Sequence, residues 1–240
     1  MQISTSLPLK SGPDFIDPLW HQAITGKPSY NLDTRMMGAD ACQLQLVTKT
    51  ADTGIALIEG VIGLFDGAAV VSGFVSLATQ KGGRISGIIA NKVGSAYHAE
   101  LLQNALSEYD LPPLIAWMER SNHSIDDRHL GLKMPERKDI TYYLPFFHAD
   151  PAIFIKAFSE NKIPEPAIST PKLLLDGKTI GVAKDAACCF IYPANLDWLI
   201  AHSAQVKFFS PLASEEISPE IDAIWIPGGY PELHTQQLPE

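Results

Sequence analysis

A short segment near the amino terminus combines one lysine with two carboxylates. Lys10 is followed by Gly12 and Pro13, which favour a turn, and then by Asp14 and Asp17, which stand three residues apart. Carboxylate oxygens are ligands for Mg²⁺, and a lysine ammonium neutralises phosphate charge. The composition therefore predicts a site for a metal ion and phosphates, and an ordinary solvated turn is the alternative.

Another carboxylate follows an apolar run. Residues Ile55 to Ile58 are typical of a buried strand, and Glu59 and Gly60 come directly after them. In open α/β sheets, ligands bind outside the carboxyl ends of the strands, where glycine lets them approach the backbone. We therefore expect Glu59 to be a Mg²⁺ ligand. The spacing fits a glutamate that caps or stabilises a turn equally well.

A third candidate is a pair of glycines near the carboxyl terminus. Gly228 and Gly229 follow Trp225, Ile226 and Pro227, a run that is typical of a strand leading into a turn. Paired glycines at such a point expose backbone N–H groups, which an oxyanion hole requires. The pattern predicts an oxyanion hole at Gly228 and Gly229, although tight turns also use this pair.

The elements that must position these residues alternate between strands and helices. Such alternation indicates βαβ units with a parallel sheet, covered by helices on both faces. For the first half of the chain, we expect strands at 55–58, 85–93 and 114–117 and a helix at 97–109.

Prolines interrupt the pattern between residues 141 and 178. The periodicity predicts one helix at 151–161, and proline density predicts an interdomain linker at 163–171. A second α/β run follows, with strands expected at 179–183, 205–209 and 221–226 and a helix at 193–203. Three strands and one helix bury only one face of a sheet well, so we expect this second unit to be incomplete.

Charge and composition exclude several classes of protein. Lysine and arginine number 18 against 27 aspartates and glutamates, and the net charge of −9 argues against a nucleic-acid partner. The three cysteines, Cys42, Cys188 and Cys189, are too few for a disulfide scaffold, and the adjacent Cys188 and Cys189 are expected to be small buried residues. The most apolar stretch contains Glu59 and Asp66, which argues against a membrane span. We therefore expect a cytoplasmic protein.

Several segments together resemble the cobyrinic acid a,c-diamide synthase family, whose members include hydrogenobyrinic acid a,c-diamide synthases. The family pattern Lys-x-Gly-Pro-Asp-Tyr-Ile-Asp-Pro is present at Lys10 to Pro18, with Phe15 in place of the tyrosine. Its Pro-Gly-Gly-Tyr-Pro-Glu-Leu-His pattern is present at Pro227 to His234. Further similar segments are 31–38, 59–67, 85–95, 128–132, 182–187 and 192–196.

The resemblance implies a function in cobalamin biosynthesis. It implies a P-loop-NTPase-like, dethiobiotin-synthetase-like domain that uses ATP and Mg²⁺ to phosphorylate the a and c acetate carboxylates of a corrinoid. It also implies a class I glutamine amidotransferase domain, whose ammonia displaces the phosphate. Lys10, Asp14 and Asp17 would bind substrate or phosphate, Glu59 would bind Mg²⁺, and Gly228 and Gly229 would form the oxyanion hole. The expected domains are a synthetase-like domain at 1–140, a helix and proline-rich linker at 141–178, and the start of the glutaminase at 179–240.

The same comparison predicts a family member shortened at both ends and internally. Family members carry a Walker A loop upstream of the Lys10 segment, an additional strand after the counterpart of Gly67, and a nucleophilic cysteine and a histidine beyond the counterpart of Glu240. We therefore expect weak or absent ATP binding and no glutaminase activity from these residues alone.

Other functions remain open at this stage. One alternative is a non-catalytic corrinoid-binding protein or partner subunit, as a homodimer or paired with a full-length paralogue. Another is an amidase of a different tetrapyrrole. The residues do not distinguish the ring metal or the ammonia source.

Overall fold

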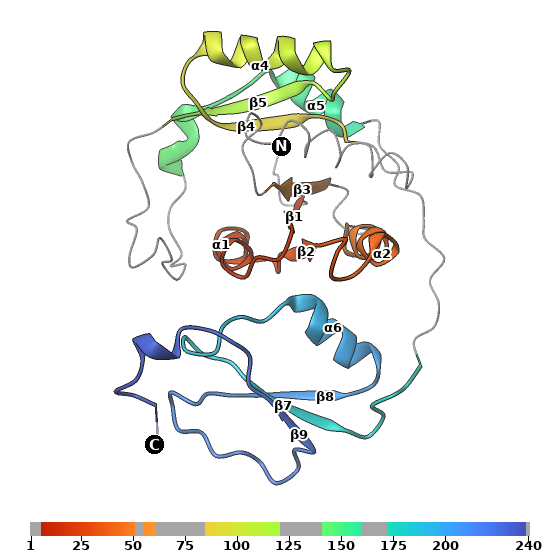
Figure 1. Cartoon of the computed structure of the whole chain (residues 1–240), viewed down its shortest axis with the longest axis vertical. Helices are drawn as coiled ribbons and strands as arrows, with labels where there is room; N and C mark the ends of the chain where they lie inside the picture. The colour runs from red at the N-terminus through yellow and green to blue at the C-terminus, as the bar shows by residue number, and fades with distance from the viewer. Residues whose placement is uncertain (1–5, 51–54, 61–84, 121–140, 160–171, 239–240) are drawn as a thin grey trace.

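The structure, a computed structural model, describes residues 6–50, 55–60, 85–120, 141–159 and 172–238 (Figure 1). The elements alternate between strands and helices, as the sequence predicts. They are β1 (Ser6–Ser11), α1 (Ile16–Thr25), β2 (Tyr30–Leu32), α2 (Ala39–Thr50), β3 (Ile55–Glu59), β4 (Ile88–Val93), α4 (Ala96–Glu108), β5 (Leu114–Glu119), η1 (Thr141–Phe146), β6 (Phe147–Ala149), α5 (Pro151–Ser159), β7 (Thr179–Ala183), α6 (Pro193–Ala201), β8 (Gln205–Phe209), β9 (Ala223–Trp225) and η2 (Pro231–Leu233).

The first sheet has the strand order β2-β1-β3, and both pairings are parallel. Helices α1 and α2 lie on either side of these strands in Figure 1. The sequence pattern did not predict β1 or β2, because β2 is short and Pro8 interrupts β1. Proline lacks the N–H that a central strand uses for pairing, so its presence argues against a central strand. Nevertheless β1 is the central strand of this sheet.

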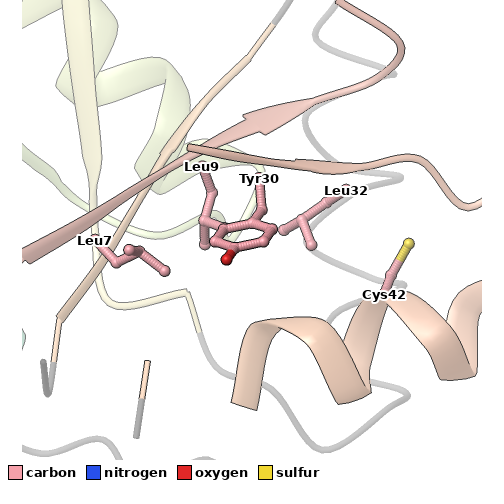
Figure 2. Packing of buried hydrophobic residues seen from close by; sticks show 5 residues of the cluster. All are labelled: Leu7, Leu9, Tyr30, Leu32 and Cys42. Atoms are coloured by element: carbon pink, nitrogen blue, oxygen red, sulfur yellow. The ribbon is translucent and has the colours of Figure 1, made fainter. Parts of the chain in front are cut away.

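The core of the first sheet is formed by alternate residues of β1 and their neighbours. Figure 2 shows Leu7, Leu9, Tyr30 and Leu32 gathered on one side of the strands, with Cys42 on the adjacent helix α2. Leu9 is completely buried. This packing fixes β1 against β2 and α2, so the polar residues that follow Leu9 start from a rigid strand.

The second sheet has the order β4-β5-β6, and it corrects the expectation of a purely parallel sheet. Strands β4 and β5 are parallel, whereas β6 pairs with β5 in the antiparallel direction. An antiparallel edge strand is common on otherwise parallel sheets. Strand β6 has only three residues, which is too short for a periodic pattern to predict it. The segment expected as helix and linker therefore contributes a strand. The linker expected at 163–171 lies outside the described residues.

The third sheet has the order β8-β7-β9 and is parallel throughout. Strands β7 and β8 have the predicted bounds, and α6 covers 193–201 of the predicted helix. Its core contains Ala183, Ala187 and Cys188, all buried. Cys188 and Cys189 are buried, which confirms their prediction as small buried residues, and Cys42 of α2 is buried as well. In contrast to these buried residues, Ile224 of the edge strand β9 is 49% exposed.

Candidate functional site

The Lys10 segment is shaped by a turn between β1 and α1. Gly12 has a φ of 84°, a left-handed conformation that glycine adopts without strain, and its N–H donates to the carbonyl of Leu32 at 3.0 Å. Asp14 Oδ1 accepts hydrogen bonds from the N–H groups of Ile16 (2.7 Å) and Asp17 (3.1 Å). These two amides have no partner inside α1, so Asp14 caps the start of this helix.

The side chain of Asn31 supports the same turn from β2. Its Nδ2 donates to the carbonyls of Gly12 (2.9 Å) and Asp14 (2.7 Å). The backbone carbonyl of Asn31 accepts from Gln45 Nε2 at 2.6 Å, which ties the turn to α2. The segment is therefore held by hydrogen bonds from two further elements, and its carboxylates lie in defined positions.

Lys10 lies among three carboxylates. Its side chain is only 3% exposed, and its Nζ donates a short hydrogen bond to Asp17 Oδ2. Glu59 Oε2 lies 3.4 Å from this ammonium, and Asp14 Oδ2 lies 3.9 Å from it. Glu59 reaches the site because β1 and β3 are parallel and place Lys10 opposite Glu59. The structure thus brings together the four residues predicted at two separate positions of the sequence.

The electrostatics of this cluster stabilise charged side chains. Burial by itself lowers the pKa of Lys10, but the hydrogen bond to Asp17 and the charges of Glu59, Asp17 and Asp14 outweigh it, and the pKa is raised. For Glu59, burial favours a higher pKa, but the hydrogen bond from His21 and the charge of Lys10 prevail and lower the pKa. Lys10 and Glu59 are therefore both ionised at neutral pH.

His21 is a member of this site that sequence reasoning did not select. Its Nε2 lies 2.8 Å from Glu59 Oε2, and its Nδ1 lies 2.8 Å from the Oγ of Ser29. Ser29 is 1% exposed, so the imidazole is fixed between a buried hydroxyl and the carboxylate. The sequence did contain one indication that His21 belongs to this site. His21 lies four residues after Asp17, which places it one turn further along the same side of α1.

The donor set fits a Mg²⁺ ion only in part. Within the described residues, no group of three or more histidine, cysteine, aspartate or glutamate side chains is arranged to hold a metal ion. However, Mg²⁺ is usually bound by one or two carboxylates together with phosphate oxygens and water. Asp17 and Glu59 both face the single cation of Lys10, which is a donor set of this kind.

The predicted oxyanion turn follows β9 and packs against the loop after β7. The N–H of Phe190 donates to the carbonyl of Gly228 at 2.9 Å. A Cβ on Gly229 would lie 1.9 Å from the carbonyl oxygen of Ala187, so only glycine permits this approach. The close contact gives Gly229 a packing reason, separate from any catalytic use of its N–H.

Asp185 holds the loop against which this turn packs. Its Oδ1 accepts from the N–H groups of Ala187 (2.9 Å) and Cys188 (3.0 Å). Its Oδ2 accepts from Ser210 Oγ (3.0 Å) and the N–H of Leu212 (2.8 Å). Burial would raise the pKa of Asp185, but these hydrogen bonds outweigh it and lower the pKa. Sequence reasoning missed this residue because two of its four partners, Ser210 and Leu212, come only after β8.

Comparison with known proteins finds relatives that match along nearly the whole chain, including both candidate sites. Residues 179–240 match the CobB/CobQ-like glutamine amidotransferase domain. A cobyrinate a,c-diamide synthase of Herminiimonas arsenicoxydans is 35% identical over 95% of this chain and 58% of its own length. A hydrogenobyrinate a,c-diamide synthase of Stutzerimonas stutzeri is 37% identical over 95% of this chain and 60% of its own. A cobyrinate a,c-diamide synthase of Picrophilus torridus is 31% identical over 96% and 61%.

The chain is a homologue of the cobyrinate and hydrogenobyrinate a,c-diamide synthases. The family resemblance predicted from the Lys10 and Gly228 segments is therefore confirmed. The chain spans about 60% of the length of the curated relatives it matches. No solved structure matches it significantly.

In this diamide synthase homologue, residues 179–240, called the amidotransferase unit below, contact the first sheet and its helices. Phe15, which follows Asp14, is stacked on Phe190 and Tyr192, and Lys49 Nζ of α2 forms an ion pair with Asp197 Oδ2 of α6 at 2.7 Å. Burial raises the pKa of the nearby Tyr30 phenol, and a hydrogen bond with Asp197 raises it further. The Lys10 segment therefore lies beside the amidotransferase unit.

Other family-like segments fall partly or wholly outside the described part of the chain. These are residues 61–67 of the Glu59 segment, with the position of the additional strand, and residues 128–132.

A separate cavity of about 660 Å³ lies between α4, β5, β6 and α5, where Trp117 stacks on His148. None of the helices in the described ranges has the length and apolar character needed to cross a membrane.

Proposed function

We propose that this chain functions in the ATP- and glutamine-dependent amidation of corrinoid carboxylates, with cobyrinate or hydrogenobyrinate as substrate. The observation that carries the proposal is the similarity to a,c-diamide synthases along 95% of the chain, including both candidate sites. In the proposed reaction, ATP phosphorylates an acetate carboxylate of the corrinoid. Ammonia from glutamine then displaces the phosphate and leaves an amide.

The proposed domains follow the division expected from the sequence. Residues 1–140 would form a P-loop-NTPase-like domain similar to dethiobiotin synthetase, residues 141–178 a helix and linker, and residues 179–240 the first part of the glutaminase. The parallel order β2-β1-β3, with α1 and α2 on either side, supports the first assignment. The match of residues 179–240 to an amidotransferase domain supports the last.

The charge of the Lys10 cluster constrains how it would bind phosphate. Lys10, Asp14, Asp17 and Glu59 carry one positive and three negative charges, a formal charge of −2. A phosphate or substrate carboxylate approaching them alone would be repelled. The cluster would therefore bind an anion together with a cation, and Asp17 and Glu59 are the residues that would hold Mg²⁺. Mg²⁺ would neutralise the phosphate charge as the phosphoryl group is transferred.

Each residue of this cluster has a distinct proposed role. Lys10 would contact phosphate, and Asp17 would hold the ammonium of Lys10 in place. Asp14 would fix the loop by capping α1 through its Oδ1, and its Oδ2 would take part in binding substrate or phosphate. In the second unit, the backbone N–H groups of Gly228 and Gly229 would stabilise the oxyanion formed during glutamine hydrolysis.

A corrinoid titration tests the proposal. The full chain is titrated separately with cobyrinate and hydrogenobyrinate, and the visible absorption bands of the ring report binding. We expect one of them to bind, and we expect Lys10→Met to weaken binding about tenfold through loss of a charge-assisted contact. Lys178→Met, which removes a lysine of an exposed ion pair with Asp222, is the matched control and should bind normally. Absence of any spectral change with either corrinoid would refute the proposal.

The same samples test turnover. After addition of ATP, Mg²⁺ and glutamine, or ammonium in place of glutamine, mass spectrometry detects conversion of carboxylate to amide. Amidation supports the diamide synthase reaction. Binding without amidation in any mixture would instead support the alternative of a corrinoid-binding protein or partner subunit.

A further inference from the structure

Phe15 is the residue through which the Lys10 segment contacts the amidotransferase unit. Its ring is stacked on Phe190, with centroids 4.9 Å apart and planes inclined by 13°. It is also stacked on Tyr192, with centroids 4.2 Å apart and planes inclined by 17°. Both partners come from the segment between β7 and α6. Such stacked pairs contribute beyond the area they bury, because their ring geometry is specific.

Phe190 in turn holds the Gly228 turn through three contacts. Its backbone N–H donates to the carbonyl of Gly228, and its ring meets the ring of Tyr230 edge-on, with centroids 5.0 Å apart. A Cβ on Gly228 would lie 3.2 Å from Phe190 Cδ2, so the ring also packs closely on this glycine. The position of Phe190 therefore determines where the turn lies.

The other end of this chain of contacts is rigid. Phe15 lies between Asp14, which caps α1, and Ile16, whose N–H donates to that cap. Asn31, 9% exposed, holds the carbonyls of Gly12 and Asp14. The backbone of Phe15 is therefore held between the turn that carries Asp14 and the first turn of α1, which carries Asp17. A displacement of this backbone would move the ring that stacks on Phe190.

The charge of Asp14 also acts on the amidotransferase unit. The pKa of Tyr192 and that of Tyr230 are raised chiefly by burial, and in both the negative charge of Asp14 contributes. The Asp14 carboxylate thus acts on two phenols of the amidotransferase unit, that of Tyr192, which stacks on Phe15, and that of Tyr230, which meets Phe190 edge-on.

We propose that Phe15 is a positioning residue that couples the Lys10 to Asp17 segment to the Gly228 to Gly229 turn by way of Phe190. Its functional meaning rests on the proposed function, in which these segments serve phosphoryl transfer and glutamine hydrolysis. Phe15 contacts no reacting group in this arrangement. It keeps the two segments in a fixed relationship, so that a change at one is communicated to the other.

Hydrogen exchange of the Phe190 amide tests this coupling in the full chain. This N–H is protected by its bond to Gly228, so it reports directly on the turn. We expect Phe15→Ala to accelerate its exchange about tenfold, the effect of losing two ring contacts, while the amides of β7 exchange as in the wild type. The amide resonances of Gly228 and Gly229 should shift in the same variant.

Three further variants separate positioning from simple packing. Phe15→Tyr preserves the stacked ring and should restore slow exchange, whereas Phe15→Leu keeps an apolar side chain without the ring and should not. Lys49→Met removes a different contact between the units, the ion pair with Asp197, without touching Phe190, and should leave the Phe190 amide protected.

Two results would overturn the proposal. One is an unchanged Phe190 amide in Phe15→Ala and Phe15→Leu. The other is an equal acceleration of β7 and Phe190 amides in both variants, which would make Phe15 a packing residue only. These measurements need neither corrinoid nor ATP, so failure of the proposed function in the titration is distinguishable from failure of the coupling.

Discussion

Lys10 Nζ and Glu59 Oε2 lie 3.4 Å apart because β1 and β3 pair in parallel with these two residues opposite each other. The pair joins segments that are distant in the sequence. Since Asp17 and Asp14 also approach the ammonium, Lys10 offsets part of the negative charge that would otherwise destabilise this edge of the sheet.

Replacing Lys10 by methionine should therefore destabilise the protein. The variant keeps the buried aliphatic stem but removes the cation that lies against both Asp17 and Glu59. We expect a loss of about 1–2 kcal/mol in the free energy of unfolding, at the modest end because both carboxylates are partly exposed to water. Urea denaturation at neutral pH measures it. Lys207→Met, which removes an exposed ion pair with Glu220, should have a smaller effect, and an equal loss in the two variants would contradict the role of Lys10.

The lowered pKa of Glu59 predicts a dependence of stability on pH. Because its folded pKa lies below the ordinary value of 4.5, the ionised carboxylate stabilises the fold at pH values above 4.5. This contribution is lost as the pH falls through the lower, folded pKa. The free energy of unfolding of Glu59→Gln should therefore decline less on acidification than that of the wild type.

The comparison isolates Glu59, since every other carboxylate titrates in both proteins. Glu232→Gln, at an exposed position of η2, is the control and should follow the wild-type curve. Parallel curves for the wild type and Glu59→Gln would show that the contacts with His21 and Lys10 contribute nothing to folding.

Substitution of the glycines should follow the available space. Gly229→Ala places its Cβ against the Ala187 carbonyl and should cost about 3 kcal/mol, whereas Gly228→Ala meets the more adaptable Phe190 ring at 3.2 Å and should cost about 1 kcal/mol. Gly94→Ala, whose Cβ would lie 3.7 Å from the nearest side-chain atom, His98 Nδ1, should change stability least. Chemical denaturation gives the order, and a Gly94 variant as unstable as Gly229→Ala would disprove the packing argument.

Asp185 should be important for the stability of the amidotransferase unit. Asp185→Ala removes the acceptor of four hydrogen bonds and should cost about 3 kcal/mol. Asp185→Asn keeps one acceptor oxygen and should lose less. Ser210→Ala deletes one of the four bonds to Asp185 and the bond that Ser210 Oγ accepts from the N–H of Ala213, and it should lose about 1–2 kcal/mol. Thermal denaturation measures the series. A loss in Ser210→Ala as large as that in Asp185→Ala would contradict this assignment.

Much of the fold was predictable from local patterns. Strands β3, β7 and β8 and helix α4 agree with the expected ranges to within a few residues, because apolar periodicity reports directly on elements with one buried face. The residues of the candidate sites, Lys10, Asp14, Asp17, Glu59, Gly228 and Gly229, were also selected by type and spacing. Their roles as ligands or oxyanion donors stay predictions.

The sequence by itself determined the family, most of the strands and helices, and the identities of the candidate site residues. Only the tertiary structure decided which of them meet. The parallel register of β1 and β3 brings Glu59 to Lys10, His21 joins them from α1, and Phe15 stacks on Phe190. Contacts of this kind join residues distant in the chain, and local periodicity carries no information about them because it reflects only which face of each element is buried.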